Sequence, residues 1–282
     1  MIEPLLASYT GIVAVLSAVL GLAVGSFLNV VVYRVPLGMS VIAPPSSCPR
    51  CGSAITSRDN VPVLSWVLLA GKCRSCHTTI SVRYPLVEAG TAAAFVAVTL
   101  HLLSDESIGT RITSGLLVLA AYLYLAAVSI ALALIDVDVH RLPNSIVLPG
   151  YVVGTALLSL AALTSGDVAP VVRAGIGLAA MWFAYFLMAM VYPGGMGFGD
   201  VKLAGVLGLF LGHLGWGELA VGSFAAFLLG GFYAIGLLVA RRATRKSGIP
   251  FGPWMLVGAW AGIFFGDRVW DGYLTLLGSV SQ

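Results

Sequence analysis

Two aspartates beside long uncharged stretches are the residues of this sequence best placed for acid–base chemistry. Asp136 closes one apolar run, and Asp200 ends the segment 195–200, which has three glycines within five residues and precedes another apolar run. Two neighbouring carboxylates cannot both ionise cheaply, so one of them keeps its proton. The ionised member can then take a proton from water while the other donates to a carbonyl oxygen, which is general acid–base hydrolysis of an amide.

All four cysteines of the chain lie in one polar loop, as two Cys-x-x-Cys pairs: Cys48 with Cys51, and Cys73 with Cys76. Thiolates at this spacing can bind one metal ion from the same side, and two such pairs complete a tetrahedron that suits Zn²⁺. Disulfides are the alternative, but they do not persist in a reducing cytoplasmic loop. Four protein ligands leave no open position for water, so we expect a zinc ion that stabilises the loop and takes no part in chemistry.

The elements that position these groups must be membrane helices. The 282-residue chain is 59% hydrophobic and only 10% charged, whereas soluble domains carry roughly 25% charged residues. Eight runs are apolar enough for a membrane helix, which needs about 20 residues: 4–33, 89–104, 112–135, 142–166, 174–199, 203–217, 219–240 and 247–266. We therefore predict an all-α polytopic membrane protein with about eight transmembrane helices, the first of them retained and not a signal peptide.

Basic residues fix the orientation of these helices. If eight helices alternate, all 15 Lys and Arg residues except Arg111, Arg173 and Arg268 fall on one side. The positive-inside rule makes that side cytoplasmic and places both termini outside. The net charge of +3 therefore reflects topology, and no nucleic-acid partner is expected.

The same alternation brings Asp136 and Asp200 to one membrane face. Each region also has a structural interpretation: Asp200 could be a helix N-cap, and Asp138, roughly 200° around a helix from Asp136, could be a solvated loop charge. Acidic residues at membrane depth usually have a partner or a function, so we expect Asp136 and Asp200 to pair. A helix dipole at Asp200 favours this residue as the base and Asp136 as the acid.

Glycines and prolines near the proposed pair are candidates for a substrate-binding loop. Gly197 and Gly199 lack a Cβ and so let an extended peptide approach the carboxylate closely. Pro250 and Pro253 flank Gly252 at the start of the last predicted helix. The prolines either simply start that helix or hold a stiff segment beside the pair.

Three features of the first two predicted helices concern packing. Gly21 and Gly25 have the small-xxx-small spacing that lets two helix backbones touch. Asn29 either makes a hydrogen bond between helices or contacts a substrate groove. Glu88 either complements a helix dipole or is a functional carboxylate at the membrane interface.

Taken together, these motifs resemble one family. The Gly-x-Gly-Asp segment 197–200, Asp136 ahead of Pro143, and the paired-cysteine loop look like those of type IV prepilin peptidases, also called leader peptidase/N-methyltransferases. These enzymes belong to the GxGD membrane aspartyl proteases. The resemblance covers nearly the whole chain.

The resemblance implies an endopeptidase of the bacterial inner membrane. It would remove the short basic leader of prepilins or pseudopilins after a glycine, at the cytoplasmic face, in pilus assembly or type II secretion. Asp136 and Asp200 would be catalytic, and the four cysteines would bind zinc. The expected partners are prepilin N-terminal segments and membrane lipid.

The resemblance also implies methylation of the new N-terminus with S-adenosylmethionine. The residues themselves contain no glycine-rich nucleotide fingerprint, so no residue is assigned to this activity. The implied organisation is a first transmembrane helix (1–34), a cytoplasmic zinc-binding loop associated with methyl transfer (35–84) and a membrane aspartyl protease core (85–282).

Two other classes of protein stay open at this stage. A proton-coupled transporter could use Asp136 and Asp200 as a relay, but the sequence has no second matching pair or repeated half. A non-catalytic membrane scaffold could dock a secretion partner through its zinc loop. A scaffold would tolerate Asp136→Asn and Asp200→Asn together, whereas a protease would not.

Overall fold

The computed structural model of the protein describes residues 3–103, 112–191, 196–241 and 250–278, with side chains from residue 9 onward. Several residues that entered the sequence predictions lie outside this part: Arg111, Gly195, Arg242, Arg245 and Lys246. The described ranges form helices and two isolated β-bridges, without a β-strand. The predicted all-α class is therefore confirmed. The chain divides into two compact units, Met1–Thr110 and Arg111–Gln282.

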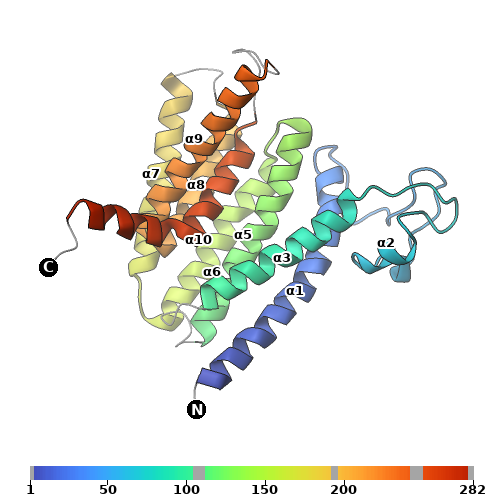
Figure 1. Ribbon diagram of the computed structural model, residues 1–282, viewed down its shortest axis with the longest axis horizontal. Coiled ribbons are helices and arrows are strands. Elements are labelled where there is room, and N and C mark those ends of the chain that lie inside the picture. The colour runs from blue at the N-terminus through green and yellow to red at the C-terminus, as the bar shows by residue number, and fades with distance from the viewer. Residues whose placement is uncertain (1–2, 104–111, 192–195, 242–249, 279–282) are drawn as a thin grey trace. The chain divides into compact units, whose positions relative to one another are not determined.

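The first unit is built on two long helices, α1 (Glu3–Arg34) and α3 (Arg83–Leu103), which pack along each other (Figure 1). A Cβ placed on Gly21 would lie 2.6 Å from Cα of Ala92, and one on Gly25 would lie 2.7 Å from Cα of Glu88. The two helix backbones thus touch where the sequence predicted a close approach. A 3₁₀ turn, η1 (Ser57–Asp59), and a short helix, α2 (Leu64–Leu68), lie in the loop between α1 and α3.

The second unit is a six-helix bundle organised around α8. Eleven of the 17 residues of this helix are buried, because α6, α7, α9 and α10 all contact it. Glycines make the closest crossings: Gly177 of α7 touches Gly208 of α8, and Gly262 of α10 touches Gly222 of α9. The elements are α5 (Ile112–Val139), α6 (Asn144–Ser165), α7 (Ala169–Val191), α8 (Phe198–Leu214), α9 (Trp216–Val239) and α10 (Gly252–Leu276).

One end of α8 is capped by a half-buried cation. Arg173 of α7 donates hydrogen bonds from Nε to the carbonyl of Gly212 at 2.8 Å, and from Nη2 to those of His213 and Leu214, both at 2.7 Å. The last carbonyls of a helix have no partner within the helix and carry partial negative charge. Arg173 therefore fixes this end of α8, and with it the position of the opposite end, where Asp200 lies.

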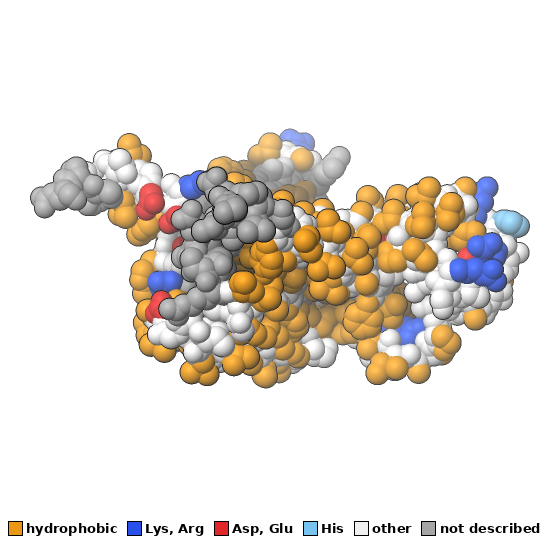
Figure 2. Space-filling view, turned by 90° about the horizontal axis from the view of Figure 1, so that it is seen from below, with side chains coloured by type: hydrophobic (Ala, Val, Ile, Leu, Met, Phe, Trp, Pro, Cys, Tyr) orange, Lys and Arg blue, Asp and Glu red, His pale blue; other side chains and the backbone are white. Residues whose placement is uncertain are grey.

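Six described helices are long and apolar enough to cross a bilayer: α1, α3, α5, α6, α7 and α9. Hydrophobic side chains cover much of the described surface in Figure 2, as expected where a protein faces lipid. Of the two other predicted crossings, α8 has only 17 residues, and α10 carries Asp267, Arg268 and Asp271 toward its end. The count of eight and the orientation stay predictions.

Candidate active site and metal centre

Asp200 lies in the first turn of α8. The backbone N–H of Gly197 donates to its Oδ2 at 3.2 Å, and the N–H of Asp200 donates to the carbonyl of Gly197 at 3.0 Å. Gly197 is the N-cap and Asp200 the third helical residue, so the N-cap interpretation of Asp200 is wrong. The carboxylate nevertheless lies at the positive end of the α8 dipole, where a negative charge is stabilised.

Asp136 lies near the end of α5 and is 5% exposed. The backbone N–H of Gly252, the first residue of α10, donates to its carboxylate. The approach is close: a Cβ on Gly252 would lie 2.6 Å from Oδ2 of Asp136 and 3.3 Å from Cδ2 of Leu142. A side chain at position 252 would therefore displace the Asp136 carboxylate.

The structure brings Asp136 and Asp200 near enough to interact electrostatically. Leu142 lies beside Gly199, which precedes Asp200, and beside Gly252, which touches Asp136: a Cβ on Gly199 would be 3.1 Å from Cβ of Leu142, and a Cβ on Gly252 would be 3.3 Å from its Cδ2. Asp138, by contrast, is exposed. Two carboxylates from helices far apart in sequence thus share one site, as acid–base chemistry requires.

A polar network holds the first turn of α8 against α6. Lys202 donates from Nζ to Oδ1 of Asn144 at 3.0 Å, and its ammonium lies 5.1 Å from the ring centroid of Phe198. The hydroxyl of Tyr151 donates to the carbonyl of Lys202 at 2.6 Å. Sequence reasoning treated Lys202 only as an orientation signal and missed this role in positioning Asp200.

Three aromatic residues from different elements pack together beside the pair. The ring centroid of Tyr185 (α7) lies 5.4 Å from that of Phe227 (α9) and 6.4 Å from that of Phe251, and the two phenylalanines are 5.3 Å apart. The sequence did not single out Tyr185, because an aromatic residue in an apolar helix carries no further signal.

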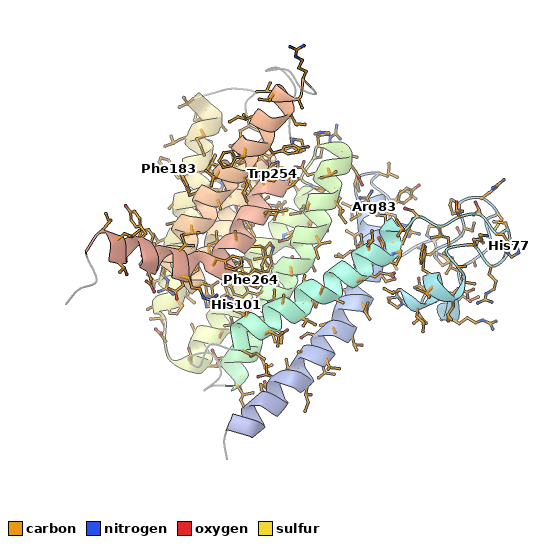
Figure 3. The ribbon with its side chains drawn as sticks, viewed as in Figure 1. His77, Arg83, His101, Phe183, Trp254 and Phe264 are labelled. Atoms are coloured by element: carbon orange, nitrogen blue, oxygen red, sulfur yellow. The ribbon has the colours of Figure 1, made fainter. Side chains whose placement is uncertain are left out.

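Among the predicted loop residues, two glycines contact other residues of the site, whereas one proline starts a helix. Gly252 touches Asp136, and Gly199 is pressed against Leu142. Pro253 lies in the first turn of α10, where proline is tolerated. Trp254, which follows it and is labelled in Figure 3, packs against Tyr233 with ring centroids 4.7 Å apart and the ring planes tilted by 38°.

The four cysteines form a compact cluster in the first unit. Their Sγ atoms all lie within 4.8 Å of one another, and Sγ of Cys48 lies 3.8 Å from Sγ of Cys76. Zinc–sulfur bonds of about 2.3 Å in a tetrahedron place the sulfurs about 3.8 Å apart. None of the four is in a disulfide. The residues fit a structural Zn²⁺ ion with no open coordination position.

Two similar turns build this cluster. The N–H of Gly52 donates to the carbonyl of Cys48, and that of His77 to the carbonyl of Cys73, at 2.9 and 3.0 Å. Both Gly52 and His77 have positive φ, of 70° and 54°. Hydrogen bonds with Ser53 lower the pKa of Cys51 to about 6.

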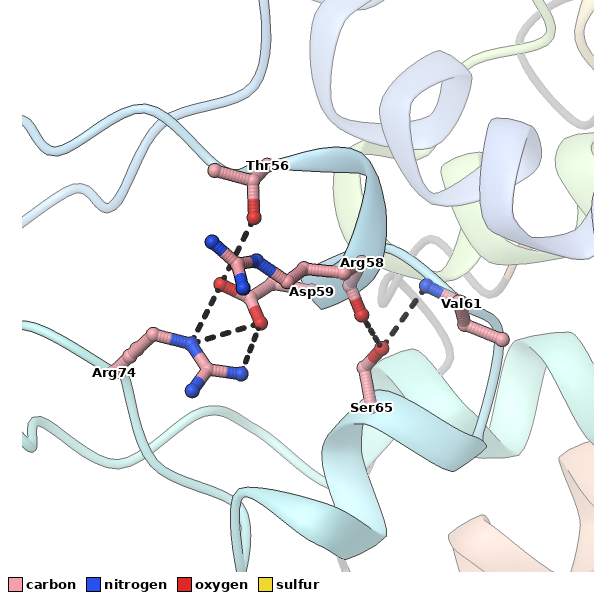
Figure 4. A network of polar contacts seen from close by, with 6 residues as sticks. All are labelled: Thr56, Arg58, Asp59, Val61, Ser65 and Arg74. Atoms are coloured by element: carbon pink, nitrogen blue, oxygen red, sulfur yellow. Dashed lines mark hydrogen bonds and ion pairs between the residues drawn. The ribbon is translucent and has the colours of Figure 1, made fainter.

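A network around Asp59 holds the loop together between the two turns (Figure 4). Nε of Arg74 donates to both carboxylate oxygens of Asp59 at 3.0 Å, and the hydroxyl of Thr56 donates to Oδ2 at 3.2 Å. The Arg74 guanidinium holds the pKa of Asp59 below its usual range. Because Arg74 lies between Cys73 and Cys76, this pair fixes the second turn.

Hydrogen bonds that involve α3 decide between the alternative roles predicted for Asn29 and for Glu88. Asn29 donates from Nδ2 to the carbonyl of Tyr84 at 3.2 Å, which is the predicted hydrogen bond between helices. Glu88 is 8% exposed, and its Oε2 accepts the N–H of Val63 at 2.7 Å. Glu88 therefore anchors the loop to α3, a role that neither interpretation had included.

Comparisons with known proteins identify the family of this chain. The Bacterial Peptidase A24 N-terminal domain matches residues 19–102, and the Type IV leader peptidase family matches residues 123–235. Curated relatives named prepilin leader peptidase/N-methyltransferase include those of Aeromonas hydrophila (35% identical, over 90% of this chain and 91% of the relative) and Pseudomonas putida (35%, 93% and 94%). That of Neisseria gonorrhoeae is 36% identical, over 90% and 91%. No solved structure matches the chain. The chain belongs to the family of prepilin leader peptidase/N-methyltransferases.

Proposed function

We propose that this chain cleaves the leader from type IV prepilins or pseudopilins after a glycine, using Asp136 and Asp200 as its acid–base pair. The observation that carries the proposal is the convergence of these two carboxylates, from the end of α5 and the start of α8, in a chain of this family. Neither a scaffold nor an isolated helix cap needs two aspartates at one site.

We assign the two carboxylates different roles. Asp200 accepts the N–H of Gly197 at the positive end of α8, which favours its ionised form. Asp200 would take a proton from water as the water oxygen attacks the peptide carbonyl carbon, and Asp136 would donate a proton to the carbonyl oxygen. When the C–N bond breaks, Asp200 would pass its proton to the leaving amine and Asp136 would recover its own.

Gly197 is the better candidate for contact with the substrate peptide. A Cβ there would meet Oδ2 of Asp200 at an ordinary 3.4 Å, so the backbone beside the carboxylate stays open to another chain. Gly199 needs to be glycine for a different reason, since Leu142 already fills the space beside it. Pro250 and Pro253, on either side of Gly252, would stiffen the opposite wall of the site.

The cysteine cluster would hold a zinc ion that stabilises the loop 35–84. The curated relatives are named as N-methyltransferases, and we propose that this chain shares the activity. S-adenosylmethionine would supply the methyl group to the new N-terminal amine of the cleaved substrate. The protein would lie in the bacterial inner membrane, with the zinc loop and the site facing the cytoplasm and both termini outside.

Cleavage by purified protein in detergent tests the proposal. A prepilin is incubated with wild type, Asp136→Asn, Asp200→Asn and the exposed control Asp138→Asn, and products are followed by mass spectrometry. We expect loss of the leader after a glycine with wild type and Asp138→Asn only. A further mass of about 14 Da, one added CH₂, would report methylation. Cleavage by both single variants of the pair would overturn the assignment, and no cleavage by any form would favour the scaffold.

A further inference from the structure

Tyr185 carries a buried hydroxyl that has no hydrogen-bond partner among the described residues. Its side chain is 2% exposed, and no group in the described part of the chain hydrogen-bonds to its Oη. Two other tyrosines that face α8 are satisfied: Tyr122 donates to the carbonyl of Phe210 at 2.7 Å, and Tyr151 donates to that of Lys202 at 2.6 Å. A buried polar group without a partner destabilises the fold, so the Tyr185 hydroxyl needs an explanation that packing does not supply.

The surroundings of this hydroxyl belong to the site of the two aspartates. The Tyr185 ring packs against Phe227 and Phe251, with ring centroids 5.4 and 6.4 Å apart. Phe251 directly precedes Gly252, whose backbone touches Asp136. Among the described residues, a donor without a partner thus lies in an apolar wall that adjoins Asp136 through Gly252.

A peptide that enters such a site needs donors from the protein. Its main-chain carbonyls leave water on binding, and in apolar surroundings each carbonyl that finds no donor weakens binding. Phenylalanine would fill the same space between Phe227 and Phe251 without adding an unpaired polar atom. The hydroxyl is therefore the part of Tyr185 that packing leaves unexplained.

We propose that Tyr185 is a substrate-binding residue whose hydroxyl donates a hydrogen bond to a main-chain carbonyl oxygen of the prepilin segment beside Asp200. The inference rests on the proposed function, because it names a residue that holds the substrate of that same site. The aromatic wall of Tyr185, Phe227 and Phe251 would pack against the apolar side of the same segment.

Tyr185→Phe tests the inference because it removes only the hydroxyl. We expect kcat/KM for prepilin cleavage to fall about 10- to 100-fold, as for the loss of one buried hydrogen bond to substrate. The melting temperature should stay the same or rise, since the free protein loses an unpaired polar atom. Binding of prepilin to Asp200→Asn should weaken by a similar factor when Tyr185→Phe is added.

Tyr122→Phe is the matched control. Tyr122 lies about 21 Å from Asp136 along α5, at a rise of about 1.5 Å per residue, and its hydroxyl already has a partner. This variant should melt at a lower temperature and keep the kcat/KM of wild type. The inference is overturned if Tyr185→Phe cleaves within twofold of wild type, or if its melting temperature and activity fall together. Full activity of Asp200→Asn would instead overturn the proposed function, so the two failures are distinguishable.

Discussion

Replacing Gly252 by alanine should damage the site without damaging the fold. The added Cβ would lie 2.6 Å from Oδ2 of Asp136, whereas ordinary contacts begin at 3.4 Å. The carboxylate must therefore retreat by about 0.8 Å to restore van der Waals contact. A displacement of about 1 Å at a catalytic group costs on the order of 100-fold in rate, so we expect kcat/KM to fall by about that factor.

Gly272→Ala is the control for this experiment, because it lies in the same helix. A Cβ at Gly272 meets no atom within 4 Å, and alanine is favoured over glycine inside a helix by about 0.5–1 kcal/mol. It should keep full activity and melt at the same or a higher temperature. Cleavage is measured with a prepilin in detergent, at equal amounts of folded protein. Wild-type kcat/KM for Gly252→Ala would refute the argument that this backbone contact fixes the position of Asp136.

Two predictions concern the first unit. Cys48→Ser should abolish stoichiometric zinc binding, measured by elemental analysis, and should make the loop sensitive to protease; a zinc content equal to wild type would contradict the four-cysteine site. Glu88→Ala should leave the buried N–H of Val63 unpaired, at a cost of about 1–3 kcal/mol in local stability, seen as faster hydrogen exchange in the loop. Glu88→Gln keeps a carbonyl acceptor, so the loop amides should exchange more slowly in this variant than in Glu88→Ala. Equal exchange rates in the two variants would refute the claim that Glu88 anchors the loop.

Much of the architecture followed from composition and spacing. Uncharged runs predicted the helices because lipid excludes charge. The Gly21–Gly25 spacing predicted where α1 and α3 touch, since only a missing Cβ permits that approach. The Cys-x-x-Cys pairs predicted the cluster because two residues between thiols bring both to one side of a tight turn.

The convergence of Asp136 and Asp200 also followed from sequence, through helix alternation. The start of α8 did not: the helix begins at Phe198 and includes Asp200, because glycine at position 197 accepts the N-cap conformation. A carboxylate before an apolar run looks the same whether it caps the helix or lies in its first turn.

Contacts between distant segments were not predictable. The backbone N–H of Val63 donates to Glu88. Because a backbone N–H does not depend on the residue type, the sequence cannot indicate this bond. Gly252 meets Asp136, and Leu142 meets Gly199 and Gly252, through tertiary packing. The charged residues of the candidate site were therefore predictable from the sequence. The apolar and backbone groups that position them were not.

A double-mutant cycle on the two aspartates tests the central claim most directly. Residues that act as one catalytic unit have non-additive effects, so removing the second costs little once the first is gone. We predict that Asp136→Asn, Asp200→Asn and the double variant all lose prepilin cleavage to the same residual rate while keeping the melting behaviour of a folded protein. Independent, additive losses, or substantial cleavage by the double variant, would contradict the assignment of Asp136 and Asp200 as one acid–base pair.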